Sequence, residues 1–271
     1  MEDIAWLGRT KLLLGEENLQ RLISAKVLIV GLGGVGSYAA EAICRAGVGT
    51  LTIVDGDVVD PTNRNRQLPA FATTHGMSKA DLMGERLLQI NPELRLTIGK
   101  SFLTPDKAEE ILQQPFDYII DAIDSITTKL TLLITAYKKG LRIISSMGAG
   151  GKLDPTKLQV ADISQTEFCA MAHYVRRRLR KEGIYTGIHT VFSTETVIKE
   201  SLMYTDGANY KRSAYGTISY LPCIFGSTCA SVVIRDLMGM EIPLYKSVYV
   251  SNRNPKKNSL HTDAFNRTHP A

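Results

Sequence analysis

The chain has 271 residues, 44% of them hydrophobic, so it can build one large domain with a substantial core. Its 32 basic and 27 acidic residues leave a net charge of +5, which allows a polyanionic partner without requiring one. The four cysteines include no C-x-x-C pair, which excludes a zinc site built on two such pairs. The first 15 residues lack the apolar core of a signal peptide, and we expect a thiol-reduced, cytoplasmic protein.

The first predicted elements form a strand, a glycine turn, a helix and a second strand. A looser arm over residues 6–10 precedes a predicted helix over 12–24. Apolar runs over 27–30 and 51–54 predict the first two strands. Between them lie the turn Gly31-Leu32-Gly33-Gly34-Val35-Gly36 and a predicted helix over 37–46.

The glycines of this turn suit a nucleotide site. Gly31 permits a tight turn out of the strand, and Gly36 lets the helix pack close to that strand. Gly33 and Gly34 let the backbone approach phosphate oxygens that a Cβ would keep away. Asp55 ends the second strand about 20 residues after the turn, where a carboxylate can hold ribose hydroxyls. The alternative, an ordinary tight turn, explains the strand, helix and acid less well.

The residues after Asp55 separate this site from that of a nicotinamide dehydrogenase. Asp57, Asn63, Arg64 and Arg66 follow within a predicted loop. A dehydrogenase does not need a second acid and two arginines beside its ribose site. A site for a nucleoside triphosphate does need such charged groups.

Strands and helices continue to alternate as far as residue 151. This predicts an α/β fold with a doubly wound, mostly parallel Rossmann-like sheet. The further elements are predicted strands over 94–98, 118–124 and 142–146, and helices over 79–90 (N-capped by Ser78), 105–113 and 129–138. Ligands of such sheets bind at the carboxyl ends of the strands, so we expect Asp55, Asp124 and residues 147–151 to share one edge.

Beyond residue 151 the pattern becomes an irregular C-terminal extension. Predicted there are short strands over 152–163, a basic helix over 175–182, a strand over 190–198 and a loop over 201–213. Residues 214–234 carry no charge and could span a bilayer, but their Ser, Thr and Pro favour a buried strand or loop followed by a core helix around 226–238.

We expect four regions along the chain. They are an N-terminal arm and helix (1–26), a nucleotide-binding core (27–151), a substrate-side extension of the same domain (152–243) and a polar basic tail (244–271).

Several motifs occur in the order found in one enzyme superfamily. They are Arg9, the glycine turn, Asp55-Gly56-Asp57, Asn63-Arg64-Asn65-Arg66-Gln67, Lys79, Asn91-Pro92 and Asp121-Ala122-Ile123-Asp124. With them the chain resembles the ubiquitin-activating superfamily of adenylating enzymes over about residues 9–151. The resemblance implies an ATP- and magnesium-dependent enzyme that acts as a homodimer.

The resemblance also implies a role for each matching residue. Gly31, Gly33, Gly34 and Gly36 would line the ATP, with Asp55 on the ribose and Asp57 beside it. Asn63, Arg66 and Lys79 would contact the phosphates, and Asp124 would hold magnesium. Arg9 would reach the triphosphate bound by the partner subunit. Arg9, Arg66, Lys79 and Asp124 are thus the expected catalytic residues.

The second half of the chain indicates a branch of this superfamily. The sequences Gly148-Ala149-Gly150-Gly151 and Val191-Phe192-Ser193-Thr194-Glu195 resemble the tRNA threonylcarbamoyladenosine dehydratases. This resemblance implies adenylation of the threonine carboxylate of a modified adenosine beside the anticodon, then ring closure with release of AMP. The implied partners are that tRNA, a second copy of the chain and, as further candidates, sulfur-transfer proteins.

The predicted basic helix suits an RNA substrate. Arg176, Arg177, Arg178, Arg180 and Lys181 could meet RNA phosphates, although an ordinary solvated basic face explains them about equally well. The main alternative enzyme activates the C-terminus of a sulfur-carrier or ubiquitin-like protein. A nicotinamide oxidoreductase and an inactive nucleotide-binding scaffold are less consistent with the filled phosphate-contact positions.

Overall fold

The computed structural model describes residues 4–204 and 213–251. Its centre is a seven-stranded sheet in the order β3-β2-β1-β4-β5-β7-β6, parallel throughout except for the β6–β7 pair. The strands are β1 (Lys26–Val30), β2 (Thr50–Val54), β3 (Arg95–Gly99), β4 (Tyr118–Asp121), β5 (Ile143–Ser146), β6 (Leu158–Asp162) and β7 (His189–Ser193). The predicted mostly parallel α/β sheet is therefore confirmed.

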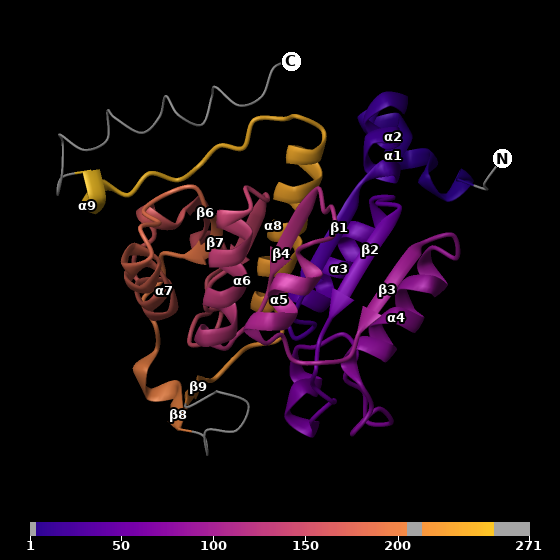
Figure 1. Cartoon of the computed structure of the whole chain (residues 1–271). Coiled ribbons are helices and arrows are strands. Elements are labelled where there is room, and N and C mark those ends of the chain that lie inside the picture. The colour runs from indigo at the N-terminus through magenta and orange to yellow at the C-terminus, as the bar shows by residue number, and fades with distance from the viewer. Residues whose placement is uncertain (1–3, 205–212, 252–271) are drawn as a thin grey trace.

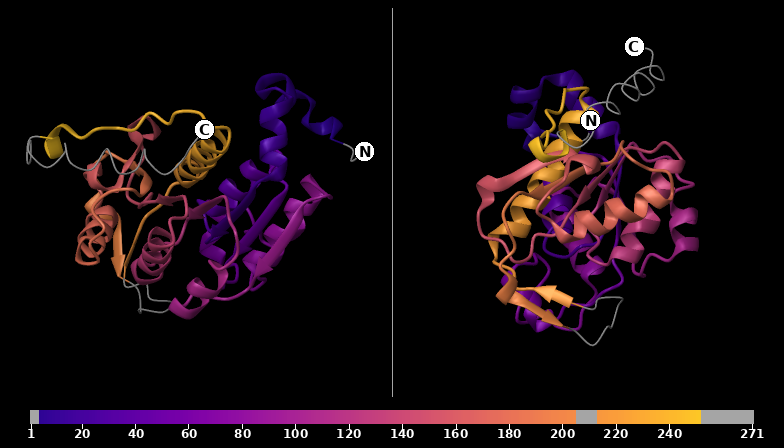
Figure 2. Two further views of the ribbon diagram at one scale, coloured as in Figure 1. Left: turned by 45° about the horizontal axis from the view of Figure 1, so that its top comes forward. Right: turned by 90° about the vertical axis from the view of Figure 1, so that its left-hand side faces the viewer.

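Two layers of helices enclose the sheet (Figures 1 and 2). One layer contains α3 (Gly36–Arg45), α4 (Lys79–Ile90) and α8 (Tyr220–Leu237), and the other contains α5 (Pro105–Ile111), α6 (Ile126–Lys138) and α7 (Ala170–Lys181). Alternate residues of β1 enter opposite layers: Val27 and Ile29 pack with the first, Leu28 and Val30 with the second. A strand buried on both faces in this way reads as a continuous apolar run.

The chain reverses its winding direction at β1. This strand pairs with β2 on one side and β4 on the other, and Val30 lies in register with both Val54 and Asp121. The segments that follow the three strands therefore leave the sheet side by side. In doubly wound sheets this switch point is where ligands bind.

The N-terminal arm is more helical than predicted. It comprises η1 (Ala5–Leu7), α1 (Gly8–Leu14) and α2 (Glu16–Ser24), instead of a loose arm and one helix over 12–24. Gly15 separates α1 from α2 with a φ of 80°. A glycine adopts this left-handed conformation at little cost, so it interrupts the helix.

Helix α8 begins six residues before the predicted core helix. Pro222 had favoured a loop, but it lies in the first turn of α8, where a missing backbone N–H costs nothing. Most of the uncharged segment over residues 214–234 therefore lies in this core helix. Within the described ranges, no helix is long and apolar enough to cross a membrane.

The C-terminal half continues the same sheet instead of leaving it. Strand β7 joins β5 in parallel, β6 adds an antiparallel edge, and β8 (Leu202–Tyr204) pairs with β9 (Ser213–Tyr215) where a loop had been predicted. The short elements are η2 (Pro61–Asn65), η3 (Pro155–Lys157), η4 (Ile163–Gln165), η5 (Lys199–Ser201) and α9 (Val248–Ser251). Residues 205–212 and 252–271, which include most of the predicted basic tail, lie outside the described residues.

Candidate functional site

The glycine turn after β1 packs against the segment after β4. Gly31 has a φ of 89°, and a Cβ there would lie 2.7 Å from the carbonyl oxygen of Ala122. A Cβ on Gly36 would lie 1.7 Å from the carbonyl oxygen of Gly31. Only glycine fits at these two positions, because any side chain would separate the turn from the strand or from its neighbour.

Asp55 connects the end of β2 to this turn. Its Oδ2 accepts the N–H of Leu32 at 2.5 Å and its Oδ1 accepts the N–H of Asp57 at 2.7 Å. Burial raises the pKa of Asp55, while the nearby Lys79 and the two backbone N–H groups oppose that rise. Each carboxylate oxygen keeps a second lone pair, so the group can still accept hydrogen bonds from ribose hydroxyls.

Arg66 comes close to the glycine turn from η2. Its Cγ lies 3.3 Å from the position of a Cβ on Gly34, and its guanidinium donates to the carbonyl oxygen of Thr62 at 3.1 Å. Burial lowers the pKa of Arg66, and the carboxylates of Asp124 and Asp60 oppose this shift. Asp124 is exposed three residues after β4. The structure thus places a half-buried cation and an exposed carboxylate at one edge of the sheet.

Lys79 begins α4 with its side chain almost fully buried. Its Nζ lies 3.1 Å from the Asp57 carboxylate, and its backbone N–H donates to the Asp57 carbonyl. Ser78 caps the helix as predicted, accepting the N–H of Asp81 at 3.2 Å. Lys79 is therefore held in place by its own helix start and by the segment after β2, facing the same carboxylates as the glycine turn.

Asn63 makes a local contact that its predicted phosphate role did not foresee. Its side-chain oxygen accepts the N–H of Asp60, and Asp60 in turn caps η2. This reciprocal capping fixes the short helix that carries Arg66.

Sequence reasoning missed the support that α8 gives to the glycine turn. A Cβ on Gly34 would lie 2.9 Å from Pro222 Cβ, and one on Gly226 would lie 2.2 Å from the carbonyl oxygen of Val35. These contacts join residues nearly 200 positions apart, so no local pattern predicts them. In the sequence, only the presence of Pro222 and Gly226 in an apolar segment could have indicated close packing there. Among the described residues, Gln67 Oε1 is a buried side-chain oxygen without a hydrogen-bond partner, and the Nε2 of the same amide would lie 3.6 Å from a Cβ on Gly33.

Two groups of predicted site residues lie elsewhere. Arg9 is exposed on α1, which lies at the end of the sheet where the strands begin, opposite the glycine turn (Figure 1). On α7 the side chains of Arg177, Arg178, Arg180 and Lys181 are exposed. Arg176 instead turns inward and donates to the carbonyl oxygen of Thr166 at 2.8 Å and to its hydroxyl.

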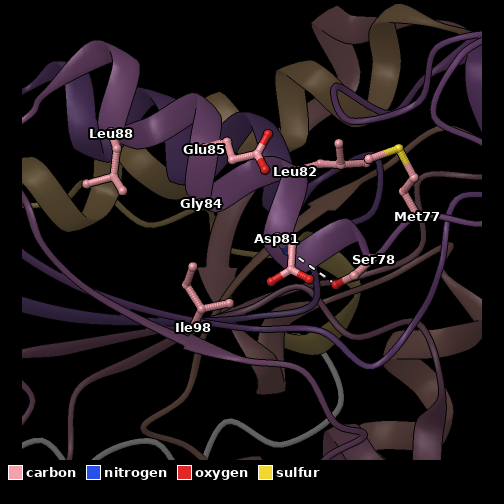
Figure 3. A pocket seen from close by; sticks show the side chains of 8 residues that line it. All are labelled: Met77, Ser78, Asp81, Leu82, Gly84, Glu85, Leu88 and Ile98. Carbon is pink, nitrogen blue, oxygen red and sulfur yellow. Dashed lines mark hydrogen bonds between the residues drawn. The ribbon is translucent and has the colours of Figure 1, made fainter.

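A hollow of about 430 Å³ lies between α4 and β3, on the outer side of the sheet edge (Figure 3). Leu82, Leu88 and Ile98 give it apolar walls, while Asp81 and Glu85 line it with carboxylates. It contains none of the residues predicted to contact nucleotide. In the described part of the chain no group of three or more His, Cys, Asp or Glu side chains could by itself hold a metal ion.

Comparison with known proteins agrees with the geometry. The ThiF family model matches residues 8–270. The tRNA threonylcarbamoyladenosine dehydratase of Bacillus subtilis is 41% identical over 238 residues, which are 85% of this chain and 94% of that protein. Crystal structures of the Escherichia coli dehydratase with ATP and with AMP superpose with TM-scores of 0.79 and 0.78 at 35% identity, each covering 88% of this chain and 97% of that one.

A relative of another activity matches a smaller part. The adenylyltransferase and sulfurtransferase uba4 of Aspergillus terreus is 39% identical over 133 residues, which are 49% of this chain and 27% of that protein. The chain belongs to the ThiF family, and within it to the tRNA threonylcarbamoyladenosine dehydratases.

Proposed function

We propose that the protein is an ATP-dependent tRNA threonylcarbamoyladenosine dehydratase. It adenylates the carboxylate of threonylcarbamoyladenosine next to the anticodon and cyclises it with net loss of water, releasing AMP and pyrophosphate. The match over 94% of the length of the Bacillus subtilis dehydratase carries this proposal. The gathering of Asp55, Arg66 and Lys79 around a glycine turn supports it. An enzyme with this substrate works where tRNA is modified, and we therefore place it in the cytoplasm.

The ATP site we propose lies at the carboxyl ends of β1, β2 and β4. The turn from Gly31 to Gly36 lines the nucleotide, Asp55 holds the ribose with Asp57 beside it, and Arg66, Lys79 and Asn63 face the phosphates. Magnesium usually binds one or two carboxylates together with substrate phosphates, which fits the exposed Asp124. Bound there, the ion would neutralise phosphate charge.

The proposed chemistry consists of two substitutions. The threonine carboxylate forms a bond to the α-phosphorus of ATP, and the bond from that phosphorus to the pyrophosphate oxygen breaks. Arg66 and Lys79 stabilise the negative charge that spreads over the phosphates. An attack from within the modified base on the activated carbonyl then closes the ring and expels AMP.

These steps require no protein nucleophile. Burial raises the pKa of both the Cys44 and Cys229 thiols to about 12, which keeps them as thiols. Reactive cysteines instead have lowered pKa values.

We propose that the site is completed in a homodimer. Helix α1 has no buried residue, and its Leu12 and Leu13 are 87% and 83% exposed. Two adjacent leucines exposed to water favour burial against another chain. Helix α1 lies at the far end of the sheet from its own glycine turn (Figure 1), which supports a role for Arg9 at the site of the partner and not at its own.

Mixed dimers test this arrangement. Arg9→Ala and Asp124→Ala subunits should each be inactive alone, whereas a mixture should regain up to about a quarter of the wild-type activity, because half of the dimers are mixed and each has one intact site. A fully active monomer by light scattering would contradict the dimer.

We propose that α7 contacts the RNA backbone. Arg177, Arg178, Arg180 and Lys181 are exposed along one helix, and Tyr174 and Tyr185, which are 54% and 59% exposed, lie on or just beyond it. Cations can neutralise phosphates, and exposed aromatic rings can stack on unpaired bases. Arg176 is left out of this set because its guanidinium is bound to Thr166.

One experiment separates the two candidate functions. AMP release from ATP and magnesium is measured with tRNA carrying threonylcarbamoyladenosine, and the nucleosides are then analysed by mass spectrometry. AMP release that depends on this tRNA, with a product lighter by one water, is expected. ATP–pyrophosphate exchange that occurs only with a glycine-tailed carrier protein would instead favour the sulfur-carrier function, which the partial match to uba4 suggests.

A further inference from the structure

A fully buried ion pair lies directly beneath the proposed active site. Lys129 of α6 and Asp121 at the end of β4 are both 0% exposed, with Lys129 Nζ 2.6 Å from Asp121 Oδ2. The same Nζ donates to Ser145 Oγ at 3.2 Å and to the carbonyl oxygen of Ser146 at 2.9 Å. One amino group therefore joins α6 to the ends of β4 and β5.

Asp121 extends this network toward Asp124. Its Oδ1 accepts the N–H of Ile123 at 3.1 Å, and its Oδ2 also accepts the hydroxyl of Ser145 at 2.5 Å. Ile123 is the residue before Asp124, and Ala122 is the residue against which Gly31 packs. The carboxylate thus fixes the bend that carries Asp124 and supports the glycine turn.

The contribution of this buried ion pair to folding stability does not by itself explain its presence. Removing two charges from water can cost more than their attraction returns, and well-packed apolar residues of similar volume are often no less stable. A charged and hydrogen-bonded group, however, specifies direction and distance in a way that apolar packing does not. Lys129 is wholly buried, so it cannot touch nucleotide or substrate itself.

We propose that Lys129, Asp121 and Ser145 are positioning residues for adenylation, which rests on the function proposed above. They hold the segment after β4 so that Asp124 faces magnesium and the phosphates, and they hold the end of β5 so that residues 147–151 keep their place beside it. Loss of this network should raise the magnesium concentration needed for AMP formation. It should have a smaller effect on the affinity for ATP without magnesium, which depends on the contacts with base and ribose.

The test compares an apolar exchange with the wild type. Lys129→Met combined with Asp121→Leu removes both charges together and leaves neither unpaired. Three quantities are measured: the thermal midpoint, the equilibrium affinity for ATP with and without magnesium, and AMP formation against magnesium concentration. We expect a folded protein whose magnesium midpoint rises at least tenfold and whose kcat falls at least tenfold. The ATP affinity without magnesium should change less than threefold.

Two further variants keep the proposal falsifiable if the double variant does not fold. Ser145→Ala removes one hydrogen bond and keeps the ion pair, and its magnesium midpoint should rise about threefold. Lys152→Met removes another buried lysine, which donates to the carbonyl oxygens of Ser193 and Glu195 at 2.7 and 2.8 Å. It should lower the thermal midpoint without moving the magnesium midpoint.

Wild-type magnesium dependence in both network variants, or an equal shift in Lys152→Met, would overturn the proposal. If the wild type forms no AMP with any substrate, the proposed function fails. The binding measurements with and without magnesium then still decide whether the network positions Asp124.

Discussion

Replacing Gly226 by alanine tests whether α8 supports the glycine turn. A Cβ at this position would lie 2.2 Å from the carbonyl oxygen of Val35, 3.1 Å from the amide nitrogen of Ala39 and 3.1 Å from Tyr38 Cβ. The Val35 oxygen already accepts the N–H of Ala39 at 3.0 Å, at the start of α3. The Val35 carbonyl cannot move away without breaking its hydrogen bond to Ala39. To accommodate the Cβ, α8 or the glycine turn must therefore shift by about 1 Å.

The expected cost follows from two opposing effects. Overpacking a core costs about 1–3 kcal/mol, whereas alanine in place of glycine inside a helix returns about 1 kcal/mol. Because the Cβ would meet a backbone oxygen and not a flexible side chain, the overpacking cost lies at the upper end of that range. We therefore expect Gly226→Ala to lower the free energy of unfolding by about 2 kcal/mol, which corresponds to about 4–8 °C in the melting temperature. Because the displaced group lies in the proposed phosphate turn, ATP affinity should fall about tenfold, or about 1.4 kcal/mol.

Gly84 in α4 provides a matched control. A Cβ there would lie 2.4 Å from Ile98 Cδ1, which is the end of a flexible side chain that is 37% exposed. Ile98 can rotate away, so Gly84→Ala should be neutral or slightly stabilising and should leave ATP affinity unchanged. Denaturant unfolding and equilibrium ATP binding measure both variants. Wild-type values for Gly226→Ala, or equal losses in the two variants, would refute the reasoning.

Three further outcomes are expected. Burial raises the pKa of Asp55, so this group favours folding at pH values below its unfolded-state pKa and loses that contribution as pH rises through its folded-state value. On acidification ATP affinity should weaken at a higher pH than for an ordinary aspartate, and Asp55→Asn should lack this pH dependence. Native protein should take up one thiol label per chain, at the half-buried Cys223, because the other three cysteines are buried; prompt labelling of a second cysteine would contradict their burial. Arg177→Glu with Arg178→Glu should weaken tRNA binding and reduce its salt dependence by about two phosphate contacts, whereas Lys107→Glu on α5 should change neither.

The sequence alone determined the elements whose signals are local. The helix predicted over 79–90 has those bounds in α4, because a serine cap starts it and an Asn-Pro pair follows it. The turn from Gly31 to Gly36 was predictable because the spacing of its glycines between a strand and a helix is a local pattern, although Ala122 and Pro222, which limit the space at Gly31 and Gly34, are distant in the chain. The α/β order followed from alternating apolar runs, and the ends of those strands brought Asp55 and Asp124 to one edge.

Only the tertiary structure decided the contacts between distant segments. Gly226 supports Val35, Lys129 pairs with Asp121, and Arg176 turns inward to Thr166. Local sequence patterns do not predict such contacts, because a buried lysine, a tightly packed helix glycine and an inward-turned arginine have the same sequence neighbours as their ordinary, exposed counterparts. The antiparallel edge strand β6 and the early start of α8 were likewise fixed by packing against the sheet, which outweighed local propensity.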